Sequence, residues 1–130
     1  MLVKDFMQKD VAVVSSHDSI YDALKIFKDK NIRRMPVIDN GKLVGIVTRK
    51  ALREASPSKA TTLSVHELNY LLSKMIIADV MKKKVVTISQ DTPIEEAGLR
   101  MHKNQIGRLP VMENDEMVGF ISSNDMFSAI

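Results

Sequence analysis

Two oxygen-bearing side chains near the C-terminus, Ser122 and Asp125, have the types and the spacing to bind a hydroxylated ligand. They follow an apolar run, Met117 to Ile121, which predicts a strand leading into a helix, and the i, i+3 spacing puts both on one helix face. A hydroxyl and a carboxylate can hydrogen-bond to sugar hydroxyls, while the free N–H groups of a helix start favour anions. The alternative is that Ser122 is only the N-cap and Asp125 only an acid in the first turn.

The sequence contains no catalytic constellation and no metal-ligand pattern. The three histidines, His17, His66 and His102, belong to different predicted elements, and none has a metal-type partner at i+3 or i+4. The run from His66 and Glu67 to Tyr70 is similar to the start of a zincin helix, but Tyr70 occupies the place of the second histidine. Nucleophile-elbow, Walker and dinucleotide motifs are missing, as is cysteine. We therefore expect a protein that is not an enzyme and holds no cofactor.

The composition is that of a globular protein of one domain, or of two small repeats packed as one unit. Of 130 residues, 45% are hydrophobic and 27% are charged. No apolar run approaches the ~20 residues of a membrane span, and the start of the chain lacks a signal-peptide pattern. With zero cysteines, this predicts a cytoplasmic protein. The net charge of +3 is mild, so the basic run Lys82–Lys84 predicts a solvated turn, with polyanion binding as a weaker alternative.

The chain contains an internal repeat. A shift of 74 positions lays residues 3–54 over residues 77–128 without a gap, with 14 identities in 52 pairs. We therefore expect three segments: a first repeat over residues 1–54, a linker over 55–76 and a second repeat over 77–130.

Each repeat shows the same order of predicted elements: strand, helix, strand, strand, helix. The β-branched runs 11–14 and 85–88 predict the first strands, and Asp18 and Thr92 the caps of the helices that follow, with Pro93 at the first helical position and Glu95 completing a capping box. Two hairpins follow, with turns at residues 39–42 and 113–116, and each leads into a short helix, from about Arg49 and from about Ser123. These patterns predict an α+β fold in which two β-α-β-β-α repeats pack sheet to sheet with pseudo-twofold symmetry, leaving clefts where the copies meet.

The linker is predicted to contain a docked helix rather than a flexible tether. Residues 55–58 break the preceding helix, and Ser64 with Glu67 forms a capping-box pattern. The positions that follow at helical spacing are apolar. They are Val65, Leu68, Leu71, Leu72 and Met75. Such an amphipathic helix should dock on the module or on a second subunit.

Two pairs of motifs identify a family resemblance. Residues 33–37 with 44–48, and 107–111 with 118–122, each combine a hydrophobic-x-x-Pro-Val type strand with a strand that carries a glycine and ends in Thr or Ser. This doubled pattern resembles the cystathionine-β-synthase (CBS) domain pair, or Bateman module. The linker, at residues 57–63 and 67–72, is similar to that of acetoin-utilisation-type CBS proteins. The chain would then be either a standalone module or a fragment of a longer protein.

The resemblance implies a sensor that binds an adenosine-containing ligand, such as AMP, ADP, ATP or S-adenosylmethionine, in a cleft between the repeats. The family's ribose motif, [Thr/Ser]-x-x-Asp, is intact in Ser122 and Asp125. Gly107 and Arg108 lie where the family places phosphate-binding groups, and an arginine fork suits a phosphate. Phe120 would close the apolar wall of the main cleft. The remaining main-cleft residues, which would read the adenine, are Asp10, Val11, Ala12, Ile32, Arg33 and Arg34.

A second cleft is expected to bind weakly or not at all. Its ribose motif begins at Thr48 but has Ala51 in place of the aspartate. The other residues that the resemblance implies for it are Ile46, Lys50, Val85, Val86 and Ile106. The family also suggests a homodimer and a regulated enzyme or transporter as partner, without nucleic acid or membrane contacts. The alternative function is a ligand-independent oligomerisation module, which nine methionines and an amphipathic linker would suit.

Overall fold

The computed structural model describes residues 1–57 and 63–128, and their elements form an α+β fold of two repeats. The described residues divide into two compact units. Unit 1 comprises Met1–Val11, Gly41–Leu43 and the second repeat from Val85. Unit 2 comprises Ala12–Asn40 and Val44–Lys84. Each unit therefore contains most of one repeat together with the opening residues of the other.

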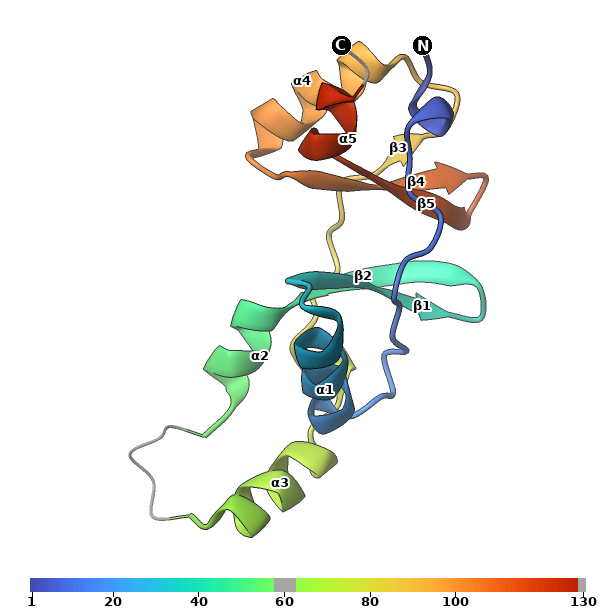
Figure 1. Cartoon of the computed structure of the whole chain (residues 1–130). Coiled ribbons are helices and arrows are strands. Elements are labelled where there is room, and N and C mark those ends of the chain that lie inside the picture. Colours follow the sequence, from blue (N-terminus) through green and yellow to red (C-terminus); the bar gives the residue numbers. More distant parts are fainter. Residues whose placement is uncertain (58–62, 129–130) are drawn as a thin grey trace. The chain divides into compact units, whose positions relative to one another are not determined.

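Unit 1 places two helices on one face of a small mixed sheet (Figure 1). Strands β4 (Arg108–Glu113) and β5 (Glu116–Ser122) are antiparallel, and β3 (Ile88–Ser89) runs parallel to β4. Helices α4 (Ile94–Asn104) and α5 (Ser123–Phe127) cover the sheet. A 3₁₀ helix, Val3–Asp5, adds a side chain from the start of the chain to the core. That core is made of Val3, Ile88, Ile94, Ala97, Met101, Leu109, Val111 and Ile121.

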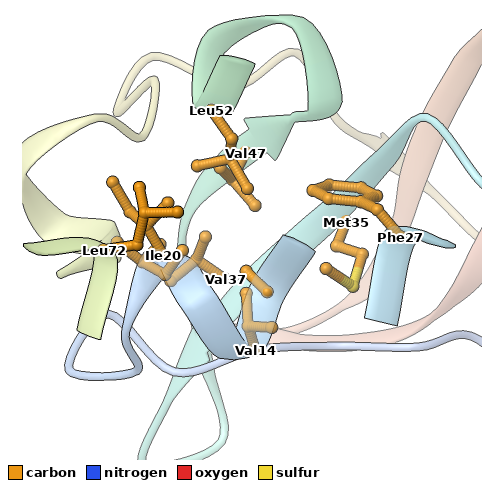
Figure 2. Close-up of a cluster of buried hydrophobic side chains, with 10 residues drawn as sticks. Val14, Ile20, Phe27, Met35, Val37, Val47, Leu52 and Leu72 are labelled. Atoms are coloured by element: carbon orange, nitrogen blue, oxygen red, sulfur yellow. The ribbon is translucent and has the colours of Figure 1, made fainter. Parts of the chain in front are cut away.

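Unit 2 repeats this plan around the hairpin of β1 (Arg34–Asp39) and β2 (Lys42–Thr48), most of which it contains. Helices α1 (Ile20–Lys30) and α2 (Arg49–Ala55) supply apolar faces, and a 3₁₀ helix spans Ile77–Asp79. Figure 2 shows Val47 beside Leu52, and Phe27 beside Met35. One face of α1 is apolar and turned to the core, with Ile20, Ala23 and Phe27 fully buried and Leu24 packed at the edge of the core.

The opening segment of each repeat is held by the body of the other repeat, within one unit. In unit 1, Val3 N donates to Thr92 O over 2.9 Å. In unit 2, Ile77 N donates to Asp18 O over 2.9 Å. The residues of these two hydrogen bonds are related by the 74-position shift of the repeat. Each repeat therefore contributes its opening segment, residues 1–11 or residues 77–84, to the unit that contains most of the other repeat, and we call these the exchanged segments. This explains why the two compact units do not coincide with the two repeats.

The first predicted strand of each repeat is wrong in extent. Of residues 11–14, only Val14 pairs, in a single parallel bridge with Val37. Of residues 85–88, only Ile88 lies in a strand, and that strand continues to Ser89. A β-branched run favours extended backbone, but a strand also needs a partner along its length, and here the neighbouring strand is met at one end only.

The predicted helix caps in the two repeats are each displaced by one residue. Ser19, not Asp18, caps α1, because the Asp18 carboxylate already accepts a hydrogen bond from Ser15 N over 2.8 Å. In the second repeat α4 begins at Ile94 after Pro93, and no side chain caps it. Ile94 N donates instead to Met1 O over 3.0 Å, so the exchanged segment takes the place of the predicted Thr92 cap and of the capping box with Glu95.

The hairpins and the linker helix agree with the sequence patterns. The first turn places Asn40 and Gly41 at φ angles of 52° and 80°, and the second places Asn114 at 57°, which is left-handed backbone that these residue types tolerate. Helix α3 (Val65–Lys74) begins at Ser64, whose hydroxyl accepts from Glu67 N over 3.1 Å. Its Leu72 lies beside Ile20 in the core of unit 2 (Figure 2), so α3 docks on α1, which agrees with the first of the two predicted alternatives, docking on the module. Residues 58–62 of the predicted linker motif lie outside the described residues.

Within residues 1–57 and 63–128, none of the helices has both the length and the apolar character that crossing a bilayer requires.

Candidate functional site

Ser122 and Asp125 form a reciprocal capping box at the end of β5. The Ser122 hydroxyl accepts a hydrogen bond from Asp125 N over 3.2 Å. In return, Asp125 Oδ2 accepts from Ser122 N over 2.8 Å and from Ser122 Oγ over 2.9 Å. The capping interpretation of these two residues is therefore confirmed. This capping role does not exclude ligand binding, because both side chains are only half-buried. The second carboxylate oxygen, Asp125 Oδ1, takes no part in the capping box and contacts a segment near the N-terminus.

That segment contributes Gln8, a residue that was not predicted to belong to the site. Gln8 Nε2 donates to Asp125 Oδ1 over 2.9 Å, although the two residues are 117 positions apart. The Gln8 backbone pairs with Phe120 in both directions, over 2.7 Å and 2.8 Å. No local motif marks Gln8. The only signal that could have found it is the repeat alignment, in which position 8 corresponds to Lys82 just as Asp125 corresponds to Ala51.

The predicted phosphate residues lie next to the capping box. Arg108 is directly opposite Ser122 in the antiparallel β4–β5 ladder, and residues opposite one another project from the same face of a sheet. Arg108 is exposed, and Gly107 O accepts a hydrogen bond from Ser123 N over 2.9 Å. One end of this hairpin therefore brings together an exposed cation, a hydroxyl and a carboxylate, a set that can bind a phosphate and a diol.

The other residues predicted for the main cleft are divided between the units. Phe120 is 6% exposed and pairs with Gln8, and Asp10 and Val11 follow Gln8 by two and three positions in unit 1. Four more belong to unit 2, where Arg33 O accepts from Arg49 N over 2.8 Å. These four are Ala12, Ile32, Arg33 and Arg34. The structure thus brings Ser122, Asp125, Arg108, Gly107 and Phe120 together, and the assembly of the full set stays a prediction.

The residues predicted for the second cleft are also divided. In unit 2, Thr48 Oγ1 accepts from Ala51 N over 3.1 Å, so the cap of the first repeat survives without its carboxylate. Ile46 pairs through its backbone with Lys82, over 2.9 Å and 2.8 Å, as Phe120 does with Gln8. Lys50 forms an exposed i, i+4 ion pair with Glu54 at 4.0 Å. Val85, Val86 and Ile106 belong to unit 1, and the last two pack against its core.

A polar cluster in unit 2 has no counterpart among the described residues of the second repeat. Asp39 Oδ1 accepts from Ser15 Oγ and from Ser16 N, both over 3.0 Å, and Oδ2 accepts from Ser16 Oγ. The hydrogen bond from the Ser16 side chain, followed by the one from the Ser16 backbone, holds the pKa of the Asp39 carboxyl below its usual value. The cluster ties the segment before α1 to the end of β1, so we interpret it as structural.

Unit 1 has an apolar groove between α4 and α5. It has a volume of about 830 Å³, and Gly98, Met101 and Met126 are among the residues that line it. Phe127, at its edge, is 70% exposed. The corresponding face of α1 in unit 2 is partly covered by α3. Separately, among the described residues no cluster of His, Cys, Asp or Glu could hold a metal ion.

Comparison with known proteins identifies the repeats. A model of the CBS domain matches residues 3–58 and again residues 77–130. A CBS domain-containing protein from Dictyostelium discoideum is 30% identical over the whole of this chain and 91% of its own length. L-aspartate semialdehyde sulfurtransferase from Methanocaldococcus jannaschii is 31% identical, but the chain spans only 22% of that enzyme's length. The likeness to that enzyme is therefore confined to a part of it.

Solved structures agree with this fold. The CBS domain pair of protein MJ0100, crystallised with 5′-methylthioadenosine and S-adenosyl-L-methionine, superposes with a TM-score of 0.76 at 30% identity, covering 99% of this chain and 94% of that one. A structure described as a putative acetoin utilization protein (AcuB) from Vibrio cholerae has a TM-score of 0.81 at 27% identity, covering 99% of this chain and 89% of that one.

Proposed function

Because the chain belongs to the CBS domain family, as a tandem pair or Bateman module, we propose that it is a non-catalytic regulatory module that binds an adenosine-containing ligand. In this proposal Ser122 and Asp125 bind the ribose and Arg108 binds a phosphate or another 5′ group. The observation that carries it is the position of Arg108 opposite Ser122, which places a cation beside the hydroxyl and carboxylate of one strand end. The adenosyl ligands of the MJ0100 pair support the ligand class.

The chemistry of the strand end suits a ribose better than an apolar or cationic ligand. Within the part of the chain that the structure describes, Asp125 Oδ1 has one partner, Gln8 Nε2. A carboxylate oxygen can accept a second hydrogen bond, here from a ligand hydroxyl. A hydrogen bond to a charged acceptor is worth roughly 1.5 to 3 kcal/mol, or about ten- to a hundredfold in affinity. The first repeat lacks this acceptor at Ala51, so the proposal includes unequal affinities at the two ribose motifs.

Isothermal titration with AMP, ADP, ATP and S-adenosylmethionine tests the proposal. At least one of these should bind the wild-type protein, and Asp125→Ala should weaken that binding by about ten- to a hundredfold. Asp115→Ala removes an exposed carboxylate from the hairpin turn of the same unit and serves as the matched control. If none of the four compounds binds, or if Asp125→Ala binds as wild type does, the assignment is wrong.

A ligand acts as a regulator only through different affinities for two states of the protein. The proposal therefore also predicts that the ligand changes a measurable property away from the site. Hydrogen exchange of backbone amides, compared with and without the compound that binds most tightly, would reveal such a change. A response confined to the residues around Ser122 would support binding without regulation.

A second candidate function, ligand-independent association of two copies of this chain, is favoured by the groove between α4 and α5. The groove has a volume of about 830 Å³ and a mostly apolar lining, and it adjoins Phe127, which is 70% exposed, so it offers an apolar surface to a second copy. Mass measurement by light scattering, with and without each nucleotide, separates the candidates. A dimer that ignores every nucleotide and dissociates on Phe127→Asp favours association, whereas Val65→Asp on the exposed face of α3 is the control.

A further inference from the structure

We infer that Gln8 is a positioning residue that sets the orientation of Asp125 and thereby the preference of the site for a ribose. The inference rests on the proposed function, and it adds a residue from the opposite end of the chain to that site. Gln8 lies outside the motif that carries the family resemblance, and its side chain reaches Asp125 from a position 117 residues earlier in the chain.

The hydrogen bonds of the Asp125 carboxylate show what Gln8 does. Oδ2 accepts from both the backbone and the hydroxyl of Ser122, so its lone pairs are engaged. Among the described residues, the one partner of Oδ1 is Gln8 Nε2, over 2.9 Å. Because an oxygen of a carboxylate accepts two hydrogen bonds, Gln8 fills one position at Oδ1 and leaves the other for a ligand hydroxyl. The amide carries no charge, so the carboxylate keeps its full negative charge for that hydroxyl.

The backbone of Gln8 is fixed independently of its side chain. Gln8 N donates to Phe120 O over 2.7 Å, and Phe120 N donates to Gln8 O over 2.8 Å. The approach is close enough that a Cβ on Gly119 would lie 2.6 Å from Gln8 O. With the backbone held on both sides, only side-chain torsions remain to be ordered, which is the condition for a preorganised binding group.

The first repeat provides an internal comparison. Lys82 pairs with Ile46 through two backbone hydrogen bonds, over 2.8 Å and 2.9 Å. The backbone arrangement that holds Gln8 is therefore present in both units. The side chains that would meet in the site differ: lysine stands in place of Gln8, and Ala51 stands in place of Asp125. A lysine at position 8 would form an ion pair with Asp125 and compete with a ligand hydroxyl. The amide and the carboxylate therefore belong together as a functional pair.

NMR titrations that compare the affinities of the protein for adenosine and for 2′,3′-dideoxyadenosine test this inference. Wild type should prefer adenosine, and Gln8→Ala and the similarly sized Gln8→Met should each reduce that preference by about three- to tenfold. A residue that only stabilises the fold would weaken both ligands alike, so the ratio is the informative quantity. Lys82→Ala, at the corresponding position of unit 2, is the matched control and should leave the ratio unchanged.

The outcomes separate the two proposals. If wild type prefers adenosine and Asp125→Ala removes the preference, but both Gln8 variants keep it in full, the role of Gln8 is refuted and the ribose site stands. If wild type binds neither nucleoside nor any adenosine nucleotide, both proposals fall. A reduced ratio in both Gln8 variants, with Lys82→Ala unchanged, supports the inference.

Discussion

A Cβ atom placed on Gly119 would lie 2.6 Å from the backbone oxygen of Gln8. Real Cβ atoms do not approach a backbone oxygen so closely. The close packing of the Gln8 backbone against β5 therefore requires a residue without a Cβ atom at position 119. The corresponding glycine in the first repeat, Gly45, has the same relationship with Lys82, whose oxygen would lie 2.9 Å away. The glycine of each motif is therefore required by the segment exchanged between the repeats, and not by a turn.

Gly119→Ala is expected to lower the free energy of unfolding by roughly 1 to 3 kcal/mol, because the backbone of Gln8 must move to admit a methyl group. It should also weaken binding of an adenosyl ligand, because Gln8 would no longer reach Asp125. Gly107→Ala is the control for stability, since its nearest new contact would be Ser123 Oγ at 3.9 Å. Urea denaturation of both variants provides the measurement, and equal stabilities would contradict the prediction.

The repeats, the hairpins and the linker helix could be predicted because local patterns determine them. Asn40 and Gly41 suit left-handed turn positions wherever the hairpin lies, and the alternation of apolar residues is visible within each element. The predicted caps of α1 and α4 are each misplaced for a different reason. At α4 a tertiary contact supplies the hydrogen bond, since Met1 O accepts from Ile94 N. At α1 the Asp18 carboxylate accepts locally from Ser15 N, which leaves Ser19 as the cap. No local pattern could identify Gln8, because its partner is 117 positions away and the two residues meet only in the folded protein.

The Asp39 cluster predicts an acid-dependent contribution to stability. Hydrogen bonds from Ser16 and Ser15 lower the pKa of Asp39 in the folded protein, so the unfolded chain takes up a proton first as the pH falls. The stabilisation is present above the unfolded pKa of about 4 and is lost as the pH drops through the lowered folded value. Asp39→Asn should therefore be less stable than wild type at pH 7, with the difference shrinking toward pH 3.

Urea denaturation at a series of pH values measures that difference. Asp115→Asn, at an exposed turn position, should differ little from wild type at pH 7. A gap between Asp39→Asn and wild type that stays constant from pH 7 to pH 3 would show that the cluster does not couple folding to protonation. Ser16→Ala should reproduce part of the loss of stability at pH 7, because it removes the hydrogen bond from Ser16 Oγ to Asp39 Oδ2.

The docking of α3 can be tested with two adjacent leucines. Leu72 is 6% exposed and lies in the core of unit 2, whereas Leu71 is 40% exposed. Leu72→Ala should lower the free energy of unfolding by about 2 to 4 kcal/mol through lost burial and the cavity left behind. Leu71→Ala should change it by less than about 1 kcal/mol. Urea denaturation measures both losses, and the comparison is valid if the two variants show the same dependence of unfolding free energy on urea concentration. Similar losses for both variants would mean that α3 does not dock through Leu72.

Restoring the missing carboxylate of the first repeat should raise its affinity for an adenosyl ligand. Ala51 N already donates to Thr48 Oγ1 over 3.1 Å. An aspartate at position 51 is therefore placed to complete a capping box like the one that Asp125 forms with Ser122.

Lys82 occupies the position equivalent to Gln8, and its backbone is held by the same pair of hydrogen bonds. The double variant Ala51→Asp with Lys82→Gln thus copies both members of the functional pair into unit 2. Titration should show about a tenfold or greater gain at the weaker site. Ala51→Asp alone should gain less, because Lys82 would compete for the new carboxylate, and equal gains for the single and double variants would contradict the pairing of the two positions.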